Sequence, residues 1–245
     1  MKAMIFAAGL GTRLRPLTDA IPKALVPVGD KPLLQRVIEK IVDAGCSEIV
    51  VNVHHFPGQI REFLVKNHDF GITIHVSDES DAVLDTGGGL LKAASFLKGN
   101  EPVLIHNVDV VSNLDLNRLL EYHISQKALA TLVVRHRETQ RYLLFDDRMR
   151  LTGWANKATG EIRKSIPESI SGSRPLAFSG IQIVEPEFLD RMSGTGKFSL
   201  IDTYLQMTVH YSILGYEDHS SVWIDVGKPE QLALAEKIFR SGKTS

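Results

Sequence analysis

The chain has 245 residues, of which 28 are Lys or Arg and 29 are Asp or Glu, so its formal net charge is −1. Nucleic-acid-binding proteins and polybasic membrane anchors need an excess of positive charge, so this balance argues against both. Hydrophobic residues make up 43% of the chain and charged residues 23%, which is typical of a globular domain and excludes a largely disordered chain.

The N-terminal half alternates between short apolar runs and segments whose apolar residues have helical spacing. In chain order, this pattern predicts a strand at 2–8, a helix at 32–44, a strand at 48–53, a helix at 57–66, a strand at 72–76, a helix at 90–97, a strand at 103–106, a helix at 116–126 and a strand at 129–135. We expect Asp30 to cap the first helix and Gly45 to end it. Such alternation is typical of a parallel sheet with right-handed crossovers.

The second half is less regular. Its pattern predicts a hairpin across 146–148, a loop or flap at 156–174, a strand at 176–184, a helix at 200–210, a strand at 221–225 and a helix at 229–240. The sequence has no internal repeat and no linker-like segment. We therefore expect a single domain over 1–245, of the α/β class: a Rossmann-like three-layer α/β/α sandwich with a mostly parallel mixed central sheet. Within it, 136–184 would form a substrate-facing elaboration.

The loop after the first strand contains two glycines followed closely by two arginines. Gly9 and Gly11 let backbone amides approach an anion, and Arg13, Arg15 and Lys23 suit a ligand with several negative charges. The alternative is a tight turn with solvated arginines. A dinucleotide fingerprint would need a glycine in place of Leu14, so this loop disfavours a dinucleotide-dependent oxidoreductase, and the ending of a P-loop is also absent.

The string Ala7-Ala8-Gly9-Leu10-Gly11-Thr12-Arg13-Leu14-Arg15-Pro16, followed by Pro22-Lys23, resembles the signature of the sugar-phosphate nucleotidyltransferases. The resemblance continues through 84–89, 107–109, 178–180 and 223–227. Among these enzymes, the chain is most similar to the N-acetylmuramate-1-phosphate uridylyltransferases. The resemblance implies transfer of a nucleotidyl group from a nucleoside triphosphate, by preference UTP, to a sugar 1-phosphate, by preference N-acetylmuramate 1-phosphate, giving an NDP-sugar and pyrophosphate.

Two other functions stay open beside this one. The first is a GTP-dependent mannose- or heptose-1-phosphate guanylyltransferase, and the second is a non-catalytic relative that senses nucleotides. The presence of Arg13, Lys23, Asp109 and Asp225 disfavours the second, because such relatives tend to lose their phosphate and metal residues. Longer relatives append hexapeptide repeats that form trimers, and this chain shows none, so we expect a monomer or a small homo-oligomer.

The resemblance implies a nucleotide site formed by Ala7, Ala8, Gly9, Gly11, Thr12, Arg13, Lys23, Glu79, Gly87 and Gly88. Arg13 would hold the triphosphate and Lys23 the reacting phosphate, which makes both catalytic. An ionised Glu79 can only accept hydrogen bonds, which suits the N3–H of uracil or the N1–H and amino group of guanine. The alternative for Glu79 is an exposed loop glutamate. For the glycines at 87–89, the alternative is the start of a helix capped by Asp85 or Thr86.

Two aspartates follow predicted strands, Asp109 after 103–106 and Asp225 at the end of 221–225. In an open parallel sheet, both would lie beside the ligand crevice at the carboxyl ends of the strands. Two carboxylates there suit Mg²⁺, which takes its remaining oxygen ligands from substrate phosphates and water. The alternative is that each is a turn or cap residue. Val108 stands where many relatives have glycine, and its side chain would narrow the sugar pocket.

By the same resemblance, the sugar phosphate would be bound by Asn107, Asn156, Lys157, Ser179 and Gly180. Lys157 is a solvated loop lysine in the alternative interpretation. Ser179 and Gly180 would allow the backbone to approach sugar hydroxyls, unless they form a β-bulge. These positions make 136–184 a sugar-binding elaboration. His54 and His55 have no metal ligand at a recognisable spacing, and we expect them to be structural.

The single cysteine, Cys46, cannot form a disulfide within the chain, which favours a reducing compartment. No stretch approaches the roughly 20 apolar residues of a membrane span. The apolar start of the chain is interrupted by Gly9, Gly11 and Arg13, so it does not fit a signal peptide. We therefore expect a cytoplasmic protein without a membrane or nucleic-acid partner.

Overall fold

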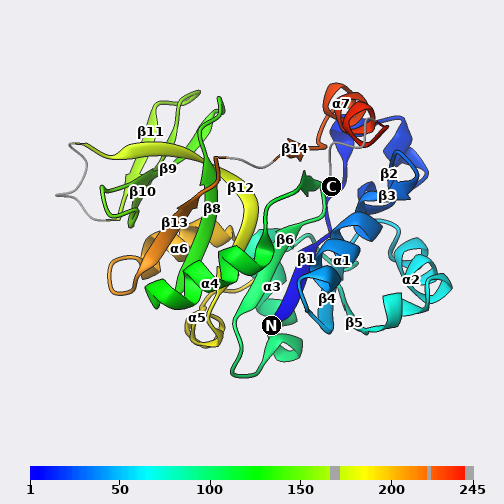
Figure 1. The fold of residues 1–245 in the computed structure, drawn as a ribbon, viewed down its shortest axis with the longest axis horizontal. Coiled ribbons are helices and arrows are strands. Elements are labelled where there is room, and N and C mark those ends of the chain that lie inside the picture. Colours follow the sequence, from blue (N-terminus) through cyan, green and yellow to red (C-terminus); the bar gives the residue numbers. More distant parts are fainter. Residues whose placement is uncertain (166–171, 220–221, 241–245) are drawn as a thin grey trace.

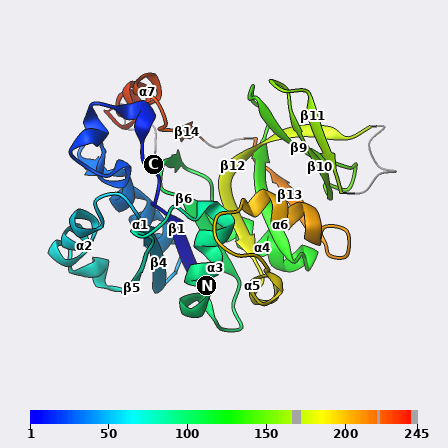
Figure 2. The same cartoon turned by 180° about the vertical axis from the view of Figure 1, so that it is seen from behind.

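The computed structural model describes residues 1–165, 172–219 and 222–240, in which a mixed β-sheet has helices on both of its faces (Figures 1 and 2). The strands are β1 (Lys2–Phe6), β2 (Pro27–Val28), β3 (Lys31–Pro32), β4 (Glu48–Val53), β5 (Thr73–Asp78), β6 (Val103–Asn107), β7 (Val110–Ser112), β8 (Ala130–Arg135), β9 (Arg141–Phe145), β10 (Leu151–Asn156), β11 (Glu161–Lys164), β12 (Arg174–Val184), β13 (Ile213–Glu217) and β14 (Trp223–Asp225). The α-helices are α1 (Leu33–Asp43), α2 (Pro57–Lys66), α3 (Asp85–Leu97), α4 (Leu116–Gln126), α5 (Pro186–Arg191), α6 (Leu200–Met207) and α7 (Pro229–Arg240).

The N-terminal strands form the parallel part of the sheet, in the order β5-β4-β1-β6. Next to β6, β12 runs antiparallel, and β8 is antiparallel to β12. The last strand, β13, pairs with β8 in the parallel direction. The sheet is therefore mixed and mostly parallel in its first half, as the alternating sequence pattern predicts.

Each face of the sheet has its own hydrophobic core. Along β1, Ala3 and Ile5 point into a core shared with α1, α2, α4 and α7. Met4, between them, points to the opposite face, into a core shared with α3, α5 and α6. This period-2 alternation inside a continuous apolar run is expected of a strand that is buried on both faces. The predicted three-layer α/β/α arrangement is confirmed.

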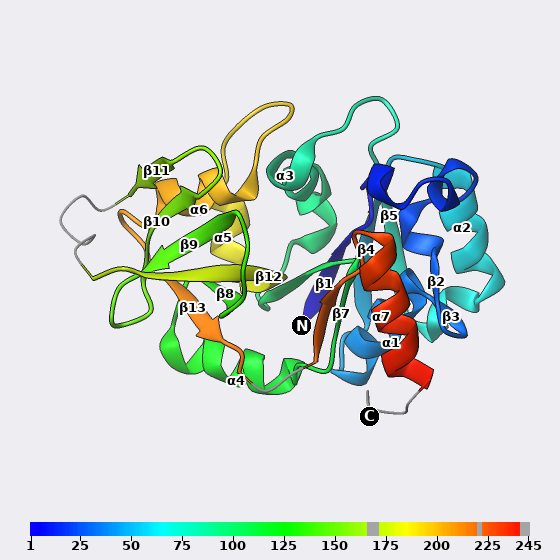
Figure 3. The same cartoon turned by 90° about the horizontal axis from the view of Figure 1, so that it is seen from above.

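The long strand β12 belongs to two groups of strands. Its last residues, Ile181–Val184, pair with β6, whereas its first residues, Arg174–Leu176, pair with β9. The antiparallel strands β9, β10 and β11 continue from there in order. Figure 3 shows this group on one side of the molecule and α1, α2 and α7 on the other, with β1 and α3 between them.

Several predicted segments coincide with those in the structure, namely β4, α2, α4 and α7. Helix α4 begins after Asp115, whose carboxylate accepts hydrogen bonds from the backbone N–H groups of Asn117 and Arg118, both at 3.0 Å. The prediction that Asp30 caps α1 is wrong. The helix begins after Pro32, and Asp30 pairs instead with the Arg36 guanidinium at 2.7 Å.

Three other expectations need correction. The glycines at 87–89 do not precede a helix, because α3 begins at Asp85 and contains them. The segment expected to be a loop or flap at 156–174 contains β11, which forms a hairpin with β10; its residues 166–171 lie outside the described part of the chain. Strand β14 is not in the main sheet but pairs with β7.

No described helix has both the length and the apolar character required to cross a membrane.

Candidate active site

The first loop is shaped by Gly11. Its φ of 65° lies in the left-handed region, and an added Cβ would approach Thr18 Cγ2 to 2.8 Å and Lys23 Cβ to 3.0 Å. The Thr18 hydroxyl donates to the Gly11 carbonyl at 2.8 Å, which closes the turn. A Cβ on Gly9, in contrast, would meet nothing within 4 Å. Gly11 is therefore required by the turn itself, while Gly9 leaves its backbone open to a ligand.

Lys23 and the two predicted metal ligands meet beside this loop. Lys23 is 7% exposed, and its ammonium donates a hydrogen bond to Asp109 Oδ2. Asp225 reaches the same place through the β7–β14 ribbon, in which it lies opposite Val110, and the next backbone N–H donates to the Asp109 carbonyl at 2.8 Å. The aspartates are therefore brought together, but only Asp109 comes from the carboxyl end of a main-sheet strand.

The two neighbouring carboxylates, Asp109 and Asp225, favour a bound cation. Burial raises the pKa of Asp225, and the nearby negative charge of Asp109 raises it further, while Lys23, Arg13 and Arg137 act in the opposite direction. Asp225 Oδ1 is a buried acceptor without a hydrogen-bond partner in the described parts of the chain. Two carboxylates, one with an unsatisfied oxygen, fit a divalent ion.

The remaining ligands of such an ion would have to come from elsewhere. Across residues 1–165, 172–219 and 222–240, no three His, Cys, Asp or Glu side chains are grouped so as to hold a metal. Mg²⁺ commonly binds through one or two protein carboxylates and completes its coordination with substrate phosphates and water. The site therefore suits a metal that arrives with a phosphorylated substrate.

Three cavities, linked in series by shared lining residues, form a cleft beside this centre. The first-loop cavity, of about 380 Å³, is lined by Ala8, Gly9, Lys23, Glu79, Val108 and Asp109 among others. The tryptophan cavity, of about 490 Å³, shares with it Phe6, Asp85, Thr86 and Asn107. The arginine cavity, of about 840 Å³, shares Arg141, Trp154, Phe178 and Ile201 with the tryptophan cavity.

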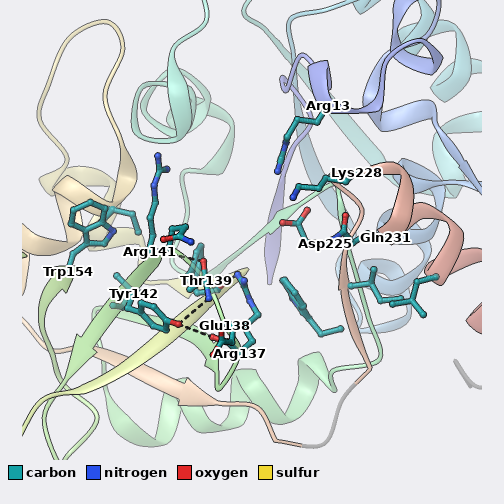
Figure 4. Close-up of a pocket in the computed structure, with 18 residues that line it drawn as sticks. Arg13, Arg137, Glu138, Thr139, Arg141, Tyr142, Trp154, Asp225, Lys228 and Gln231 are labelled. Carbon is teal, nitrogen blue, oxygen red and sulfur yellow. Dashed lines mark hydrogen bonds between the residues drawn. The ribbon is translucent and has the colours of Figure 1, made fainter. Parts of the chain in front are cut away.

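The arginine cavity has two chemically different sides (Figure 4). Arg13, Lys228 and Asp225 lie on one side, and Arg141 and Trp154 lie on the other. A Cβ on Gly227 would lie 2.8 Å from Arg13 Nη2 and 2.9 Å from Asp225 Oδ1, so this glycine lets the guanidinium and the carboxylate share the space. The side with Arg13 therefore includes Asp225, one of the two predicted metal ligands.

Glu79 is buried, with 1% of its surface exposed, so the alternative of an exposed loop glutamate is wrong. Its Oε1 accepts from Asn52 Nδ2 at 2.7 Å, and Asn52 Oδ1 accepts from the Ala7 N–H at 2.7 Å. Burial raises the pKa of Glu79. His54 has a structural contact, as expected, because its Nδ1 lies 2.6 Å from the Glu79 carbonyl oxygen. The backbone N–H of Ala7, a predicted nucleotide-binding residue, thus has its hydrogen-bond acceptor within the protein.

The glycine run in α3 is required by packing. A Cβ on Gly87 would lie 2.4 Å from the Phe198 ring, and one on Gly88 would lie 2.2 Å from the Gly196 carbonyl oxygen. A Cβ on Gly89 would lie 2.7 Å from Glu79 Oε1. None of the three lines the cavities described above, although Asp85 and Thr86 before them do.

The structure brings some of the predicted sugar residues into the cleft and leaves others outside it. Asn107 and Asn156 line the tryptophan cavity. Lys157 does not line these cavities, and its ammonium lies 4.7 Å from the centre of the Tyr142 ring. Ser179 is fully buried, and its carbonyl accepts from Trp223 Nε1 at 2.8 Å. Gly180, with φ 76°, lies in a bulge of β12, and a β-bulge was the alternative to a sugar contact in the sequence analysis.

Val108 lies beside the reactive groups of the first-loop cavity. It is 4% exposed and lines the first-loop cavity together with Lys23 and Asp109, but not the tryptophan cavity. Thr12 is exposed and lines none of the three cavities. The sequence analysis did not predict a role for Asn52. This residue is a polar side chain within the otherwise apolar run near the end of β4, and that break in the apolar pattern was the only signal that could have indicated it.

Comparisons with known proteins identify the family of the chain. The model of the nucleotidyl transferase family matches residues 2–241. An N-acetylmuramate alpha-1-phosphate uridylyltransferase of Neisseria meningitidis serogroup B is 30% identical over 249 residues, which cover 99% of this chain and 100% of the relative. A protein of the same name from Caulobacter vibrioides is 31% identical over 241 residues, with 96% and 95% covered. A mannose-1-phosphate guanyltransferase of Pichia angusta is 30% identical, and this chain spans 65% of its length.

Solved structures share the fold at lower sequence identity. A UDP-glucose pyrophosphorylase complexed with UDP-glucose has a TM-score of 0.80 at 18% identity, with 98% of each chain covered. HddC from Yersinia pseudotuberculosis complexed with GMP-PN has a TM-score of 0.76 at 21% identity, with 97% of this chain and 99% of the other covered. The family match and the full-length relatives agree with the cleft described above: the chain belongs to the nucleotidyl transferase family and is a sugar-1-phosphate nucleotidyltransferase.

Proposed function

We propose that this enzyme transfers a uridylyl group from UTP to N-acetylmuramate 1-phosphate, giving UDP-N-acetylmuramate and pyrophosphate. The observation that carries the proposal is the meeting of Arg13 from the first loop, the Lys23–Asp109 pair and Asp225 at one place. The choice of substrates is supported by the two full-length relatives that bear this activity in their names.

The mechanism follows from charge. The phosphate oxygen of a sugar 1-phosphate is already anionic at neutral pH, so it can attack the α-phosphorus of the nucleotide without a general base. The obstacle is the repulsion between two polyanions, and the residues of the site oppose it by positioning and neutralisation. Asp109 holds the Lys23 ammonium at the junction of the loop and the cleft, where it can donate to the reacting phosphate. We propose that Arg13 binds the leaving pyrophosphate.

We propose that Asp109 and Asp225 hold Mg²⁺, as enzymes of this family generally use a divalent metal. When bound, the ion supplies charge neutralisation at the phosphate oxygens and a template for in-line displacement. The unsatisfied Asp225 Oδ1 supports this assignment, because a buried carboxylate oxygen without a donor is costly unless something else pairs with it.

For the base, we propose that Glu79 accepts a hydrogen bond from N3–H of uracil. Its carboxylate lines the first-loop cavity and is fixed in orientation by Asn52. Guanine also offers donors to a carboxylate, and mannose-1-phosphate guanyltransferases are relatives at similar identity. GTP is therefore the alternative that the experiment must separate from UTP.

For the sugar, we propose that 136–184 forms a sugar-binding elaboration of a single domain over 1–245, of which 166–171, 220–221 and 241–245 lie outside the described chain. Trp154 and Asn156 of β10 offer an apolar ring and an amide to the tryptophan cavity, which suits the mixed surface of a sugar. We also propose that the enzyme works in the cytoplasm, because its one cysteine, Cys46, is free and buried.

The test is a pyrophosphate-release assay with Mg²⁺, in which ATP, CTP, GTP, UTP and dTTP are each combined with the 1-phosphates of N-acetylmuramate, N-acetylglucosamine, mannose and glucose. We expect the highest kcat/KM for UTP with N-acetylmuramate 1-phosphate. A preference for GTP with mannose 1-phosphate would overturn the substrates and keep the reaction class. Nucleotide binding without pyrophosphate release from any pair would favour the nucleotide-sensing alternative.

A further inference from the structure

We propose that Arg141 binds a carboxylate on the sugar substrate and thereby determines the specificity of the enzyme for an acidic sugar 1-phosphate. The inference rests on the proposed function and deepens it. N-acetylmuramate 1-phosphate carries two anionic groups, its phosphate and the carboxylate of its lactyl ether. N-acetylglucosamine 1-phosphate is the same sugar without that ether, so a site that distinguishes the two must recognise the second anion.

Arg141 lies where such a group would have to be recognised. It is the first residue of β9 and pairs with Asn156 on β10. Directly opposed residues of antiparallel strands project their side chains from the same face, and both of these line the tryptophan cavity. Trp154, two residues before Asn156 on β10, lines the same cavity. One edge of this hairpin thus presents a guanidinium, an amide and an indole to the ligand.

The position of Arg141 also separates it from the phosphate-binding end of the cleft. It lines both the tryptophan and the arginine cavities, so it lies at their junction. Figure 4 shows it on the side of the arginine cavity opposite Arg13, Lys228 and Asp225. A sugar between the two sides would have its phosphate near the aspartates and its other end near Arg141. The cleft therefore offers cations for two anionic groups on one substrate.

Two other arginines that line these cavities, Arg163 and Arg137, are engaged by the protein. Arg163 pairs with Asp202 and lies 4.1 Å from the centre of the Trp154 ring. Arg137 donates to the Phe178 carbonyl at 3.1 Å and lies 4.6 Å from the centre of the Trp223 ring. The Arg141 guanidinium, by contrast, has no hydrogen bond or ion pair with any residue that the structure describes.

A planar guanidinium without an internal partner is suited to a carboxylate, which it can bind through two parallel hydrogen bonds. Because the carboxylate does not take part in the reaction, its contact should stabilise the bound substrate and the transition state equally. Loss of Arg141 is then expected to raise KM for the acidic sugar far more than it lowers kcat.

The experiment measures kcat/KM with UTP for N-acetylmuramate 1-phosphate and for N-acetylglucosamine 1-phosphate, and the readout is the ratio of the two values. It compares the wild type, Arg141→Gln, Arg141→Lys and the control Arg148→Gln. Arg148 is an exposed arginine in the turn at the other end of the same hairpin and lines none of the three cavities. A variant that is merely less stable would lower both values and leave the ratio unchanged.

We expect the wild type to prefer the acidic sugar, Arg141→Gln to lower the ratio by roughly ten- to a hundredfold, and Arg141→Lys to restore part of it, because a charge-assisted contact is worth about one to two decades of affinity. Arg148→Gln should keep the wild-type ratio. If the wild type prefers the acidic sugar and Arg141→Gln does too, Arg141 is not the determinant and the proposed function stands. If the wild type has no such preference, the proposed sugar and the inference both fail, and the reaction class remains.

Discussion

Asp225 is a half-buried carboxylate beside that of Asp109, and this arrangement destabilises the folded protein in the absence of a cation. Its pKa is raised above the ordinary 3.8, chiefly by burial and then by Asp109. The folded state therefore binds a proton at Asp225 more tightly than the unfolded chain does. It follows that Asp225 makes the metal-free protein less stable as pH rises from below 3.8 through its folded-state pKa.

The prediction is that Asp225→Asn removes this destabilisation. In the presence of a chelator, the variant should melt at a higher temperature than the wild type at pH 7, and the difference should shrink towards pH 4. The same variant should lose roughly a hundredfold or more in kcat with metal, because an amide is a poor ligand for Mg²⁺ and the ion contributes several kcal/mol to the transition state. Thermal melts across pH and pyrophosphate release measure the two effects. An equal pH dependence of both melting temperatures would contradict the assignment.

Glu79 and Asn52 form a buried polar pair at the first-loop cavity. We predict that Glu79→Ala lowers the free energy of unfolding by about 1–3 kcal/mol, because Asn52 Nδ2 loses its acceptor in a buried place. Glu79→Gln keeps an acceptor oxygen, so it should cost less. Urea unfolding measures the stability, and KM for UTP reports the contact with the base. An Ala variant with wild-type stability and wild-type KM would show that Glu79 has neither role.

At the scale of elements, the sequence predicted well those segments whose signals are local. Helix α4 has an N-cap aspartate and apolar residues at helical spacing, and α2 starts with Pro57, so their bounds could be read from neighbouring residues. The short strands β2, β3 and β7, the five-residue strand β13 and the helix α5 were missed. Strands of two or three residues have no periodicity to detect, and β11, with its mostly exposed residues, exists by pairing with β10.

The glycine run of α3 shows how a distant contact can override a local interpretation. Glycine is normally unfavourable inside a helix, and its replacement by Ala in an open position should stabilise by up to about 1 kcal/mol. Gly88 is different, because its Cβ position lies 2.2 Å from the Gly196 carbonyl oxygen, more than 100 residues away along the chain. No pattern within 85–97 reveals that neighbour.

We therefore predict that Gly88→Ala destabilises the protein by about 1–3 kcal/mol through overpacking. The matched control is Gly58→Ala in α2, where an added Cβ meets nothing within 4 Å and should be neutral or slightly stabilising. The midpoint of urea unfolding distinguishes the two variants. If Gly88→Ala were as stable as Gly58→Ala, the contact between α3 and the segment at 194–198 would not be as described.

At the scale of the whole molecule, the sequence predicted the fold class and the reaction class, while the shape of the cleft depends on contacts between distant segments. Asp109 and Asp225 were expected to meet at one sheet edge, and they do meet, although Asp225 arrives on the separate β7–β14 ribbon. Arg141 was not predicted as a site residue. It faces the cleft only because β12 links its strand group to the main sheet, and that connection has no local signature.

The central claim is that the Lys23–Asp109 pair and Asp225 form the reaction centre of a sugar-1-phosphate nucleotidyltransferase. It is tested most directly by the kcat of pyrophosphate release from Asp109→Asn, measured at saturating Mg²⁺ with the best substrate pair of the wild type. Asp147→Asn, an exposed carboxylate in the β9–β10 turn, is the matched control. We predict that Asp109→Asn keeps its fold and loses roughly a hundredfold or more in kcat, since it removes both the metal ligand and the anionic partner of Lys23. A folded Asp109→Asn variant with a kcat close to that of Asp147→Asn would contradict the account.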